Sequence, residues 1–146
     1  MSKAVHNINL DLPDGWDNKT IYTYMGPDDS GVQHILSLVV DDDIETTNVS
    51  EFAGQRTEVI RENMSSITVL KDESKELPSG RVVHEFVYKW IPTDDKIIFQ
   101  KVVYLLLDDI GYTFSCNFSK KTIKTIGLQV DQIIDSFNRE DEEEEE

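Results

Sequence analysis

Three long runs of β-forming residues in the second half of the chain constrain its fold most strongly. They span residues 81–91, 96–107 and 112–118, and clusters containing paired aspartates separate them at 92–95 and 108–111. Runs of β-branched and aromatic residues bounded by turn residues are typical of strands joined as hairpins. The connections are too short for a crossover, so the sequence predicts an antiparallel sheet.

The first half of the chain predicts further strands. Residues 21–25 and 32–40 flank the turn sequence Gly-Pro-Asp-Asp-Ser-Gly at 26–31, which indicates a second hairpin. Weaker alternating patterns at 6–12 and 67–70 predict two shorter strands. Together these segments predict a sheet of about six to seven strands.

Two segments have helical periodicity. Asn48 followed three residues later by Glu51 fits a capping box, and apolar residues then recur at helical spacing through Met64, which predicts a helix over 49–64. Ser119 can cap a second helix that runs to about residue 138, whose apolar stripe is Ile123, Ile126, Val130, Ile133, Ile134 and Phe137. We therefore predict an α+β fold in which both amphipathic helices cover one face of the antiparallel sheet, as a two-layer sandwich.

Composition sets the class of protein. A chain of 146 residues is one domain by length, expected over 1–138, followed by a disordered acidic tail at 139–146. The net charge of −15 disfavours nucleic acid and anionic membranes as partners. Cys116 is the only cysteine, and the first residues lack the apolar core of an export signal, so we expect a cytoplasmic protein without direct membrane insertion.

Residues that could carry chemistry are isolated in the sequence. His6, His34 and His84 are far apart, and none has a second metal ligand at helical or strand spacing. Cys116 alternates with aromatic residues, which predicts a small core residue, and no basic residue adjoins it in the sequence to activate the thiol. The paired aspartates lack the spacing of a calcium loop, and no phosphate-binding glycine loop occurs. We expect no catalytic residue, no metal and no cofactor.

The predicted sheet has two apolar faces, although one face of an antiparallel sheet is commonly polar. Pairing Leu107 with Tyr112 and Ile91 with Lys96 gives one nearly apolar face, which the helices should cover. The reverse face then combines apolar residues with hydroxyls and amides, including Val87, Gln100, Val102, Tyr104, Leu106, Ser115 and Asn117. Such a patch predicts a protein-binding surface, unless a loop or a second copy of the chain covers it.

The sequence Leu10-Asp11-Leu12-Pro13-Asp14-Gly15-Trp16, the strand at 21–25 and the order of elements after it resemble the DcrB-like family over about residues 6–138. That resemblance implies a fold related to PsbP and to Mog-type Ran-binding proteins. Its cytosolic branch contains the Eag chaperones of type VI secretion, homodimers that shield the hydrophobic N-terminal helices of an effector.

The resemblance adds residues to the predicted binding surface. It implies that Ile21 and Thr23 line the groove, together with Leu36, Leu38 and Val40 from the hairpin partner. The expected function is therefore that of a non-catalytic chaperone or adaptor, and the expected state is a homodimer. The alternative is a stand-alone DcrB-like adaptor that binds a folded protein through the acidic loops at 41–43 and 108–109.

Overall fold

Two-residue turns set the register of two hairpins. In the computed structural model, which describes residues 11–16, 20–42, 44–64, 66–93 and 96–137, Ser30 and Gly31 join β1 (Thr20–Asp29) to β2 (Val32–Asp41). Asp108 and Asp109 join β5 (Lys96–Leu107) to β6 (Ile110–Phe118). All four turn residues have positive φ, between 54° and 79°. Positive φ at both central residues is the backbone of a type I′ turn, whose twist matches that of the flanking strands.

The remaining strands complete one sheet. β3 (Thr68–Glu76) and β4 (Val82–Thr93) pair with each other, and the strand order is β1-β2-β6-β5-β4-β3 with every pair antiparallel. α1 (Val49–Asn63) connects β2 to β3, and α2 (Ile126–Asp135) follows β6 after a 3₁₀ turn, η1 (Thr122–Lys124). The α+β class, the six-stranded antiparallel sheet and the two helices confirm the prediction.

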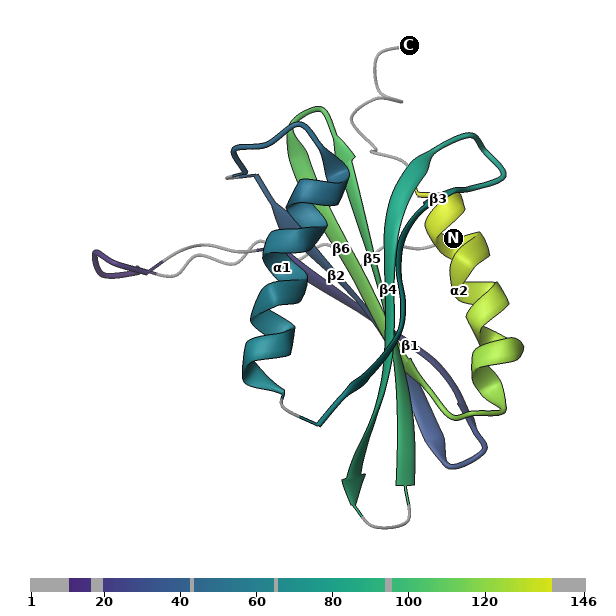
Figure 1. Ribbon diagram of the computed structural model, residues 1–146. Helices are drawn as coiled ribbons and strands as arrows, with labels where there is room; N and C mark the ends of the chain where they lie inside the picture. Colours follow the sequence, from purple (N-terminus) through teal and green to yellow (C-terminus); the bar gives the residue numbers. More distant parts are fainter. Residues whose placement is uncertain (1–10, 17–19, 43, 65, 94–95, 138–146) are drawn as a thin grey trace.

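The predicted placement of both helices on one face is wrong. α1 and α2 lie on opposite sides of the sheet, so the domain has three layers (Figure 1). The cause is the register of β4. A bulge between Trp90 and Thr93 pairs Trp90 with Ile98, whereas the predicted pairing joined Ile91 to Lys96. A shift of one residue turns every side chain of a strand to the other face, and it moves His84, Phe86 and Tyr88 beneath α1.

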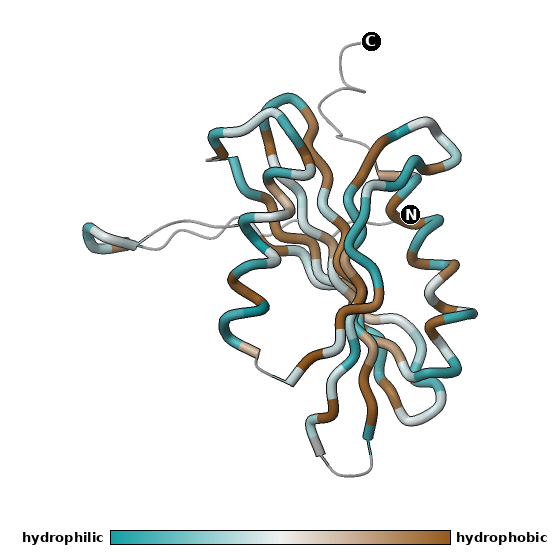
Figure 2. Tube along the Cα trace, viewed as in Figure 1, coloured by the Kyte–Doolittle hydropathy of each residue, from teal (hydrophilic) through white to brown (hydrophobic). Residues whose placement is uncertain are grey.

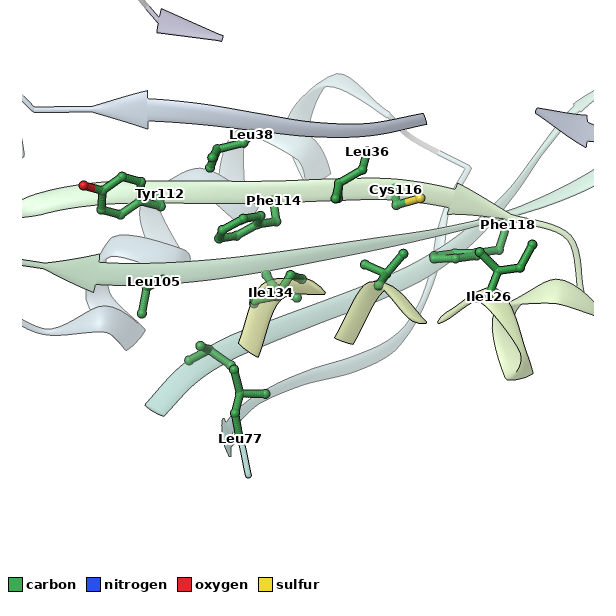
Figure 3. Close-up of a cluster of buried hydrophobic side chains, with 13 residues drawn as sticks. Leu36, Leu38, Leu77, Leu105, Tyr112, Phe114, Cys116, Phe118, Ile126 and Ile134 are labelled. Carbon is green, nitrogen blue, oxygen red and sulfur yellow. The ribbon is translucent and has the colours of Figure 1, made fainter. Parts of the chain in front are cut away.

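α2 closes its face of the sheet. Apolar side chains of β2 and β6 point to the same side as Ile126 and Ile134 of α2 (Figure 3). Phe137 follows α2 and packs on Tyr112 and Phe114, with ring centroids 4.7 and 5.5 Å apart. Between the helices the strands are the most hydrophobic part of the chain (Figure 2).

α1 begins where its sequence predicts. The side chain of Asn48 accepts hydrogen bonds from the backbone N–H of Ser50 at 2.8 Å and of Glu51 at 3.2 Å, which caps the helix. Phe52 lies directly over Gly111 at the start of β6, and a Cβ at position 111 would stand 2.5 Å from the Phe52 ring. Glycine at 111 therefore allows α1 to approach the sheet at this point.

Two other elements differ from the prediction, and two predicted segments lie mostly or wholly outside the described residues. β3 extends to Glu76 instead of ending near residue 70. The last helix starts at Ile126 instead of directly after Ser119, since the 3₁₀ turn η1 precedes it. The Ser119 hydroxyl accepts a hydrogen bond from the backbone N–H of Thr122 at 3.1 Å. Most of the strand predicted at 6–12, and the acidic tail at 139–146, lie outside the described residues. Within the described ranges, no helix is both long enough and apolar enough to cross a membrane.

Candidate protein-binding surface

α1 covers only half of its face of the sheet. Its core consists of side chains from β4 and β5, namely Phe86, Tyr88, Val102 and Tyr104, together with Phe52 and Ala53 of the helix. On the same face, the neighbouring strands β2 and β6 present side chains that are only half-buried: Ile35, Ser37 and Val39 from β2, and Thr113, Ser115 and Asn117 from β6. We call these six residues the open strip.

The open strip continues onto the edge strand. Register pairs Ile21 with Val39, Thr23 with Ser37 and Met25 with Ile35, so all three β1 side chains lie on the α1 face. Each of the three is exposed. No described element of the chain packs over this half of the face, in contrast to the α2 face, where the alternate residues of β2 and β6 are buried.

A groove of about 370 Å³ runs between α1 and the open strip. Arg56, Val59 and Ile60 of α1 form its wall. Its floor comes from four strands and consists of Val39, Asp41, Tyr88, Gln100, Val102, Tyr104, Thr113 and Ser115. The groove therefore combines apolar side chains, such as Val59, Ile60 and Val102, with the hydroxyl groups of Thr113 and Ser115 on β6.

One end of the groove is fixed by an ion pair. Arg56 donates to the carboxylate of Asp41, and its guanidinium lies 5.0 Å from the centroid of the Phe52 ring. Asp41 is buried in this pair, so it does not present a free charge at the loop after β2. This arrangement weakens the acidic-loop alternative at residues 41–43, of which Asp43 lies outside the described residues.

The two tyrosines under α1 are structural. Burial raises the pKa of Tyr88, and the Tyr88 hydroxyl donates to Sδ of Met64 at 3.7 Å. Burial, reinforced by Tyr88, also raises the pKa of Tyr104, whose ring meets Phe52 edge-on at 5.7 Å. Both phenols therefore stay protonated and contribute a polar but uncharged floor to the groove.

The structure divides the predicted binding residues between the two faces. Eight lie on the α1 face: Ile21, Thr23, Gln100, Val102, Tyr104, Leu106, Ser115 and Asn117. Val102 and Tyr104 are buried beneath α1, and the others are exposed or half-buried. The other four predicted binding residues do not lie in the groove, so that part of the prediction is wrong. The strand register places them on the α2 face: Leu36, Leu38, Val40 and Val87.

Sequence reasoning missed the helix side of the groove. Arg56, Val59 and Ile60 were assigned to the first helix without a role in binding, since periodicity alone does not say which face of the sheet a helix covers. Val39 was also missed as a binding residue. The alternation of Ser37 and Val39 with buried leucines in β2 is the signal that could have identified this strip.

A charge cluster surrounds the buried carboxylate of Glu85 on the α2 face of the sheet. The carboxylate of Glu85 is 1% exposed and lies 3.3 Å from Nζ of Lys101, 3.6 Å from Nζ of Lys75 and 3.5 Å from Nζ of Lys71. Lys101 also donates to Asp131 of α2 at 2.8 Å, which ties the helix to the sheet. Burial opposes ionisation of Glu85, but the three lysines outweigh it and hold the pKa of that carboxyl below its ordinary value.

Two histidines are engaged in the fold. Nε2 of His84 lies 2.6 Å from Asp72 on β3, while its Nδ1 is buried without a hydrogen-bond partner. His34 bridges the carbonyl of Pro27 at 2.8 Å and the hydroxyl of Thr122 at 2.9 Å, which links the β1–β2 hairpin to η1. Neither ring presents a free nitrogen to the groove, and no group of three potential metal ligands occurs among the residues that the structure describes.

The thiol of Cys116 is buried in the α2-side core. Burial raises the pKa of the Cys116 thiol to about 11, so it stays protonated near neutral pH. The buried ionisable groups described above therefore pack in the two cores or form ion pairs and hydrogen bonds within the fold.

Comparisons with solved structures identify the fold. The chain matches a protein of unknown function from Pseudomonas aeruginosa, PA94, with a TM-score of 0.68 and 11% identity over 94% of both chains. It also matches CyanoP, the PsbP protein of Synechocystis sp. PCC 6803, with a TM-score of 0.51 and 15% identity over 87% of this chain and 83% of that one. The expected relation to the PsbP fold is confirmed.

A weaker similarity, with a TM-score of 0.46 and 11% identity over 79% of each chain, is to LpqN of Mycobacterium tuberculosis, a protein involved in cell envelope biogenesis. No family model matches the sequence, and no curated protein matches it.

Proposed function

We propose that the protein binds an apolar helix of another protein along the open half of its α1 face. The observation that carries this proposal is the half-covered face itself. α1 packs over β4 and β5, while the strip made by β6, β2 and β1 has no described element over it. A sheet surface that mixes apolar and hydroxyl side chains, and that no described element covers, has the composition of a protein-interaction site.

The dimensions of the strip suit a helix. Neighbouring strands lie about 4.8 Å apart, so three strands give a band roughly 10 Å wide. An α-helix with its side chains has a diameter of about 10 Å, and packed helices lie 8–10 Å from each other. A bound helix would therefore lie beside α1, in contact with Val59 and Ile60, and complete the layer that α1 begins.

The short hydroxyl side chains of the strip favour a helix that carries small residues. Thr23, Ser37 and Ser115 alternate with Ile21 and Val39 on this face, so short hydroxyl groups stand among branched apolar ones. Short side chains allow close backbone approach, and hydroxyls can bond to polar groups of a helix that carries glycine or serine. These are the features of membrane-spanning helices that must be shielded while they are in water.

The proposed biological role is that of an adaptor or chaperone. The resemblance to Eag chaperones suggests that the partner is a type VI secretion effector whose hydrophobic N-terminal helices need cover in the cytoplasm. The PsbP-like fold supports this role because it is the fold that the resemblance implies. Ile21 and Thr23 also lie on the open half of the α1 face, where the resemblance places a groove. No redox, hydrolytic or transfer step is part of the proposal.

A capture assay tests the proposal with a defined probe. The probe is a soluble carrier protein with an N-terminal segment of about 20 Leu, Ala and Gly residues, the length of a membrane span. On co-expression, the tagged chain should keep this carrier soluble and co-purify with it. A carrier with a Gly-Ser segment of equal length should not co-purify. Equal recovery of both carriers would contradict the proposal.

Val59→Asp is expected to reduce capture of the Leu-Ala-Gly carrier at least about tenfold, because it replaces an apolar contact of the groove wall, beside Ile60, with a carboxylate. Leu128→Asp is the matched control, since Leu128 is an exposed apolar residue of α2 (61% exposed, against 51% for Val59) and lies outside the groove. Co-purification measures the effect in both variants. Equal loss in both would show that the α1 groove is not the site.

A further inference from the structure

α1 runs along β6, so the groove beside the helix has two distinct ends (Figure 1). Phe52, in the first turn of α1, lies over Gly111 at the start of β6. Met64, at the opposite end of the helix, contacts Tyr88, and register places Tyr88 level with Asn117 near the end of β6. We call these two ends the Gly111 end and the Asn117 end of the groove.

The Gly111 end is bordered by acidic side chains from two loops. The β5–β6 turn and the segment that follows β2 meet here, because Asp41 pairs with Gly111 across the two strands. Segments 41–48 and 106–112 contain no lysine or arginine, and Arg56 of the groove wall is already paired with Asp41. Four acidic residues are exposed at this end: Asp42, Glu45, Asp108 and Asp109. Among the described residues, this end therefore carries an excess of negative charge.

The Asn117 end carries charges of both signs. The β1–β2 turn and the residues that follow β6 emerge here, at the opposite end of the sheet from Gly111. Asp28 and Asp29 at the end of β1 lie at this end together with Lys120 and Lys121, and all four are exposed. The described charges are therefore nearly balanced at the Asn117 end and one-sided at the Gly111 end.

The open strip is as long as a membrane-spanning helix. β6 has nine residues, and a strand rises about 3.3 Å per residue, so the strip is about 30 Å long. A helix of about 20 residues, the length of a membrane span, is also about 30 Å long. Such a helix fills the strip from end to end, and the residues that flank it reach the loops. In membrane-spanning helices these flanking residues are often lysine and arginine.

We propose that the acidic loops at the Gly111 end bind lysine or arginine residues that flank the apolar helix of the partner. This proposal rests on the proposed function, since it concerns a helix seated in the groove, and it adds a sequence feature that the partner carries. Opposite charges on two molecules speed their encounter and fix their relative orientation. A helix with a basic flank therefore lies with that end over the start of β6.

A competition between two carriers tests the charge preference. Both begin with the Leu-Ala-Gly segment, but one has three lysines directly before it and the other has three glutamines. On co-expression with the tagged chain the two carriers compete for the groove, and mass spectrometry gives the ratio in which they co-purify. After correction for the expression of each carrier, we expect about fivefold more of the lysine carrier, as a few exposed charge pairs would give.

Two matched double variants locate the preference. Asp42→Asn combined with Asp109→Asn removes two charges at the Gly111 end and should lower the ratio to less than about twofold. Asparagine tolerates the positive φ of 65° at position 109, so the β5–β6 hairpin is retained. Asp28→Asn combined with Asp29→Asn removes the same charge at the Asn117 end and should leave the ratio at about fivefold.

The outcomes separate this proposal from the helix-binding function. Equal capture of the two carriers by the wild type would overturn the role of the acidic loops while the groove still binds a helix. A lysine preference that survives Asp42→Asn with Asp109→Asn, or that is lost equally in Asp28→Asn with Asp29→Asn, would also overturn it. Capture of neither carrier would contradict the proposed function itself, and the role of the acidic loops with it.

Discussion

Glu85→Gln is expected to lower the free energy of unfolding by about 3 kcal/mol at pH 7, although the two side chains have nearly the same size. This is the largest effect on stability that we predict. The substitution removes the carboxylate that lies within 3.6 Å of three lysine ammonium groups. Lys101 is buried beneath α2, and without Glu85 only Asp131 remains to balance its charge. Leaving a buried charge poorly paired is more costly than losing a surface ion pair.

The difference between wild type and Glu85→Gln should depend on pH. Because the pKa of Glu85 is lower in the folded state than its ordinary value of 4.5, the ionised carboxylate stabilises the fold above that value. This contribution is lost as the pH falls through the lower, folded-state pKa. The difference in unfolding free energy should therefore be full at pH 7 and narrow progressively below pH of about 4.5. Urea denaturation at several pH values measures it.

Glu62→Gln serves as the control for this prediction. Glu62 is exposed at the outer surface of α1, so its substitution should change the unfolding free energy by no more than about 0.5 kcal/mol. A Glu85→Gln protein as stable as wild type at pH 7, or a difference that stays constant down to pH 3, would contradict the assignment of Glu85 as an ionised, stabilising group.

Ser115→Arg is expected to abolish capture of the Leu-Ala-Gly carrier while leaving the domain folded. Ser115 lies on the floor of the groove, half-buried between Ser37 of β2 and Val102 of β5. A long charged side chain there fills the space that a bound helix needs and places a cation against it. Because the groove is open, the arginine can extend to water, so we expect a change in unfolding free energy below about 1 kcal/mol.

Gln132→Arg is the control for the added charge. Gln132 is exposed on α2, on the opposite side of the sheet, and the substitution changes the net charge by the same amount. Capture should persist in this variant, as measured by co-purification of the carrier. Undiminished capture by the Ser115→Arg protein, with its fold verified by circular dichroism, would show that the helix does not lie over β6.

Much of the sheet could be predicted from the sequence because its signals are local. The Asp108–Asp109 and Ser30–Gly31 turns lie between alternating apolar runs, and both hairpins form where the pattern indicates them. The full length of β3 could not be predicted, because most side chains of this edge strand are exposed to water and the strand therefore lacks an alternating apolar pattern. Its alternation of charges after Leu70 has no hydrophobic period.

The side of the sheet that each helix covers could not be predicted because it depends on a bulge. Pro92 is the only mark of the irregularity between Trp90 and Thr93, since proline inside a strand is typical of a bulge. That irregularity decides whether Phe86 and Tyr88 face α1 or α2.

Unknown strand register also affected the prediction of the binding surface. Gln100, Ser115 and Asn117 were assigned to the correct sheet face from β5–β6 pairing. Leu36 and Leu38 came from the resemblance and were misplaced, because the resemblance does not fix the register of β2 with β1 and β6.

The most direct test of the half-covered face is photo-cross-linking with the Leu-Ala-Gly carrier. A diazirine-bearing residue of similar size replaces Val39 in the open strip, and the same residue replaces Leu128 on α2 in a second protein. After irradiation of the captured complexes, mass spectrometry should locate adducts between position 39 and the apolar segment of the carrier, and none from position 128. Adducts from position 128 alone, or from position 39 only to the chain's own N-terminal residues, would contradict binding of a partner helix at this surface.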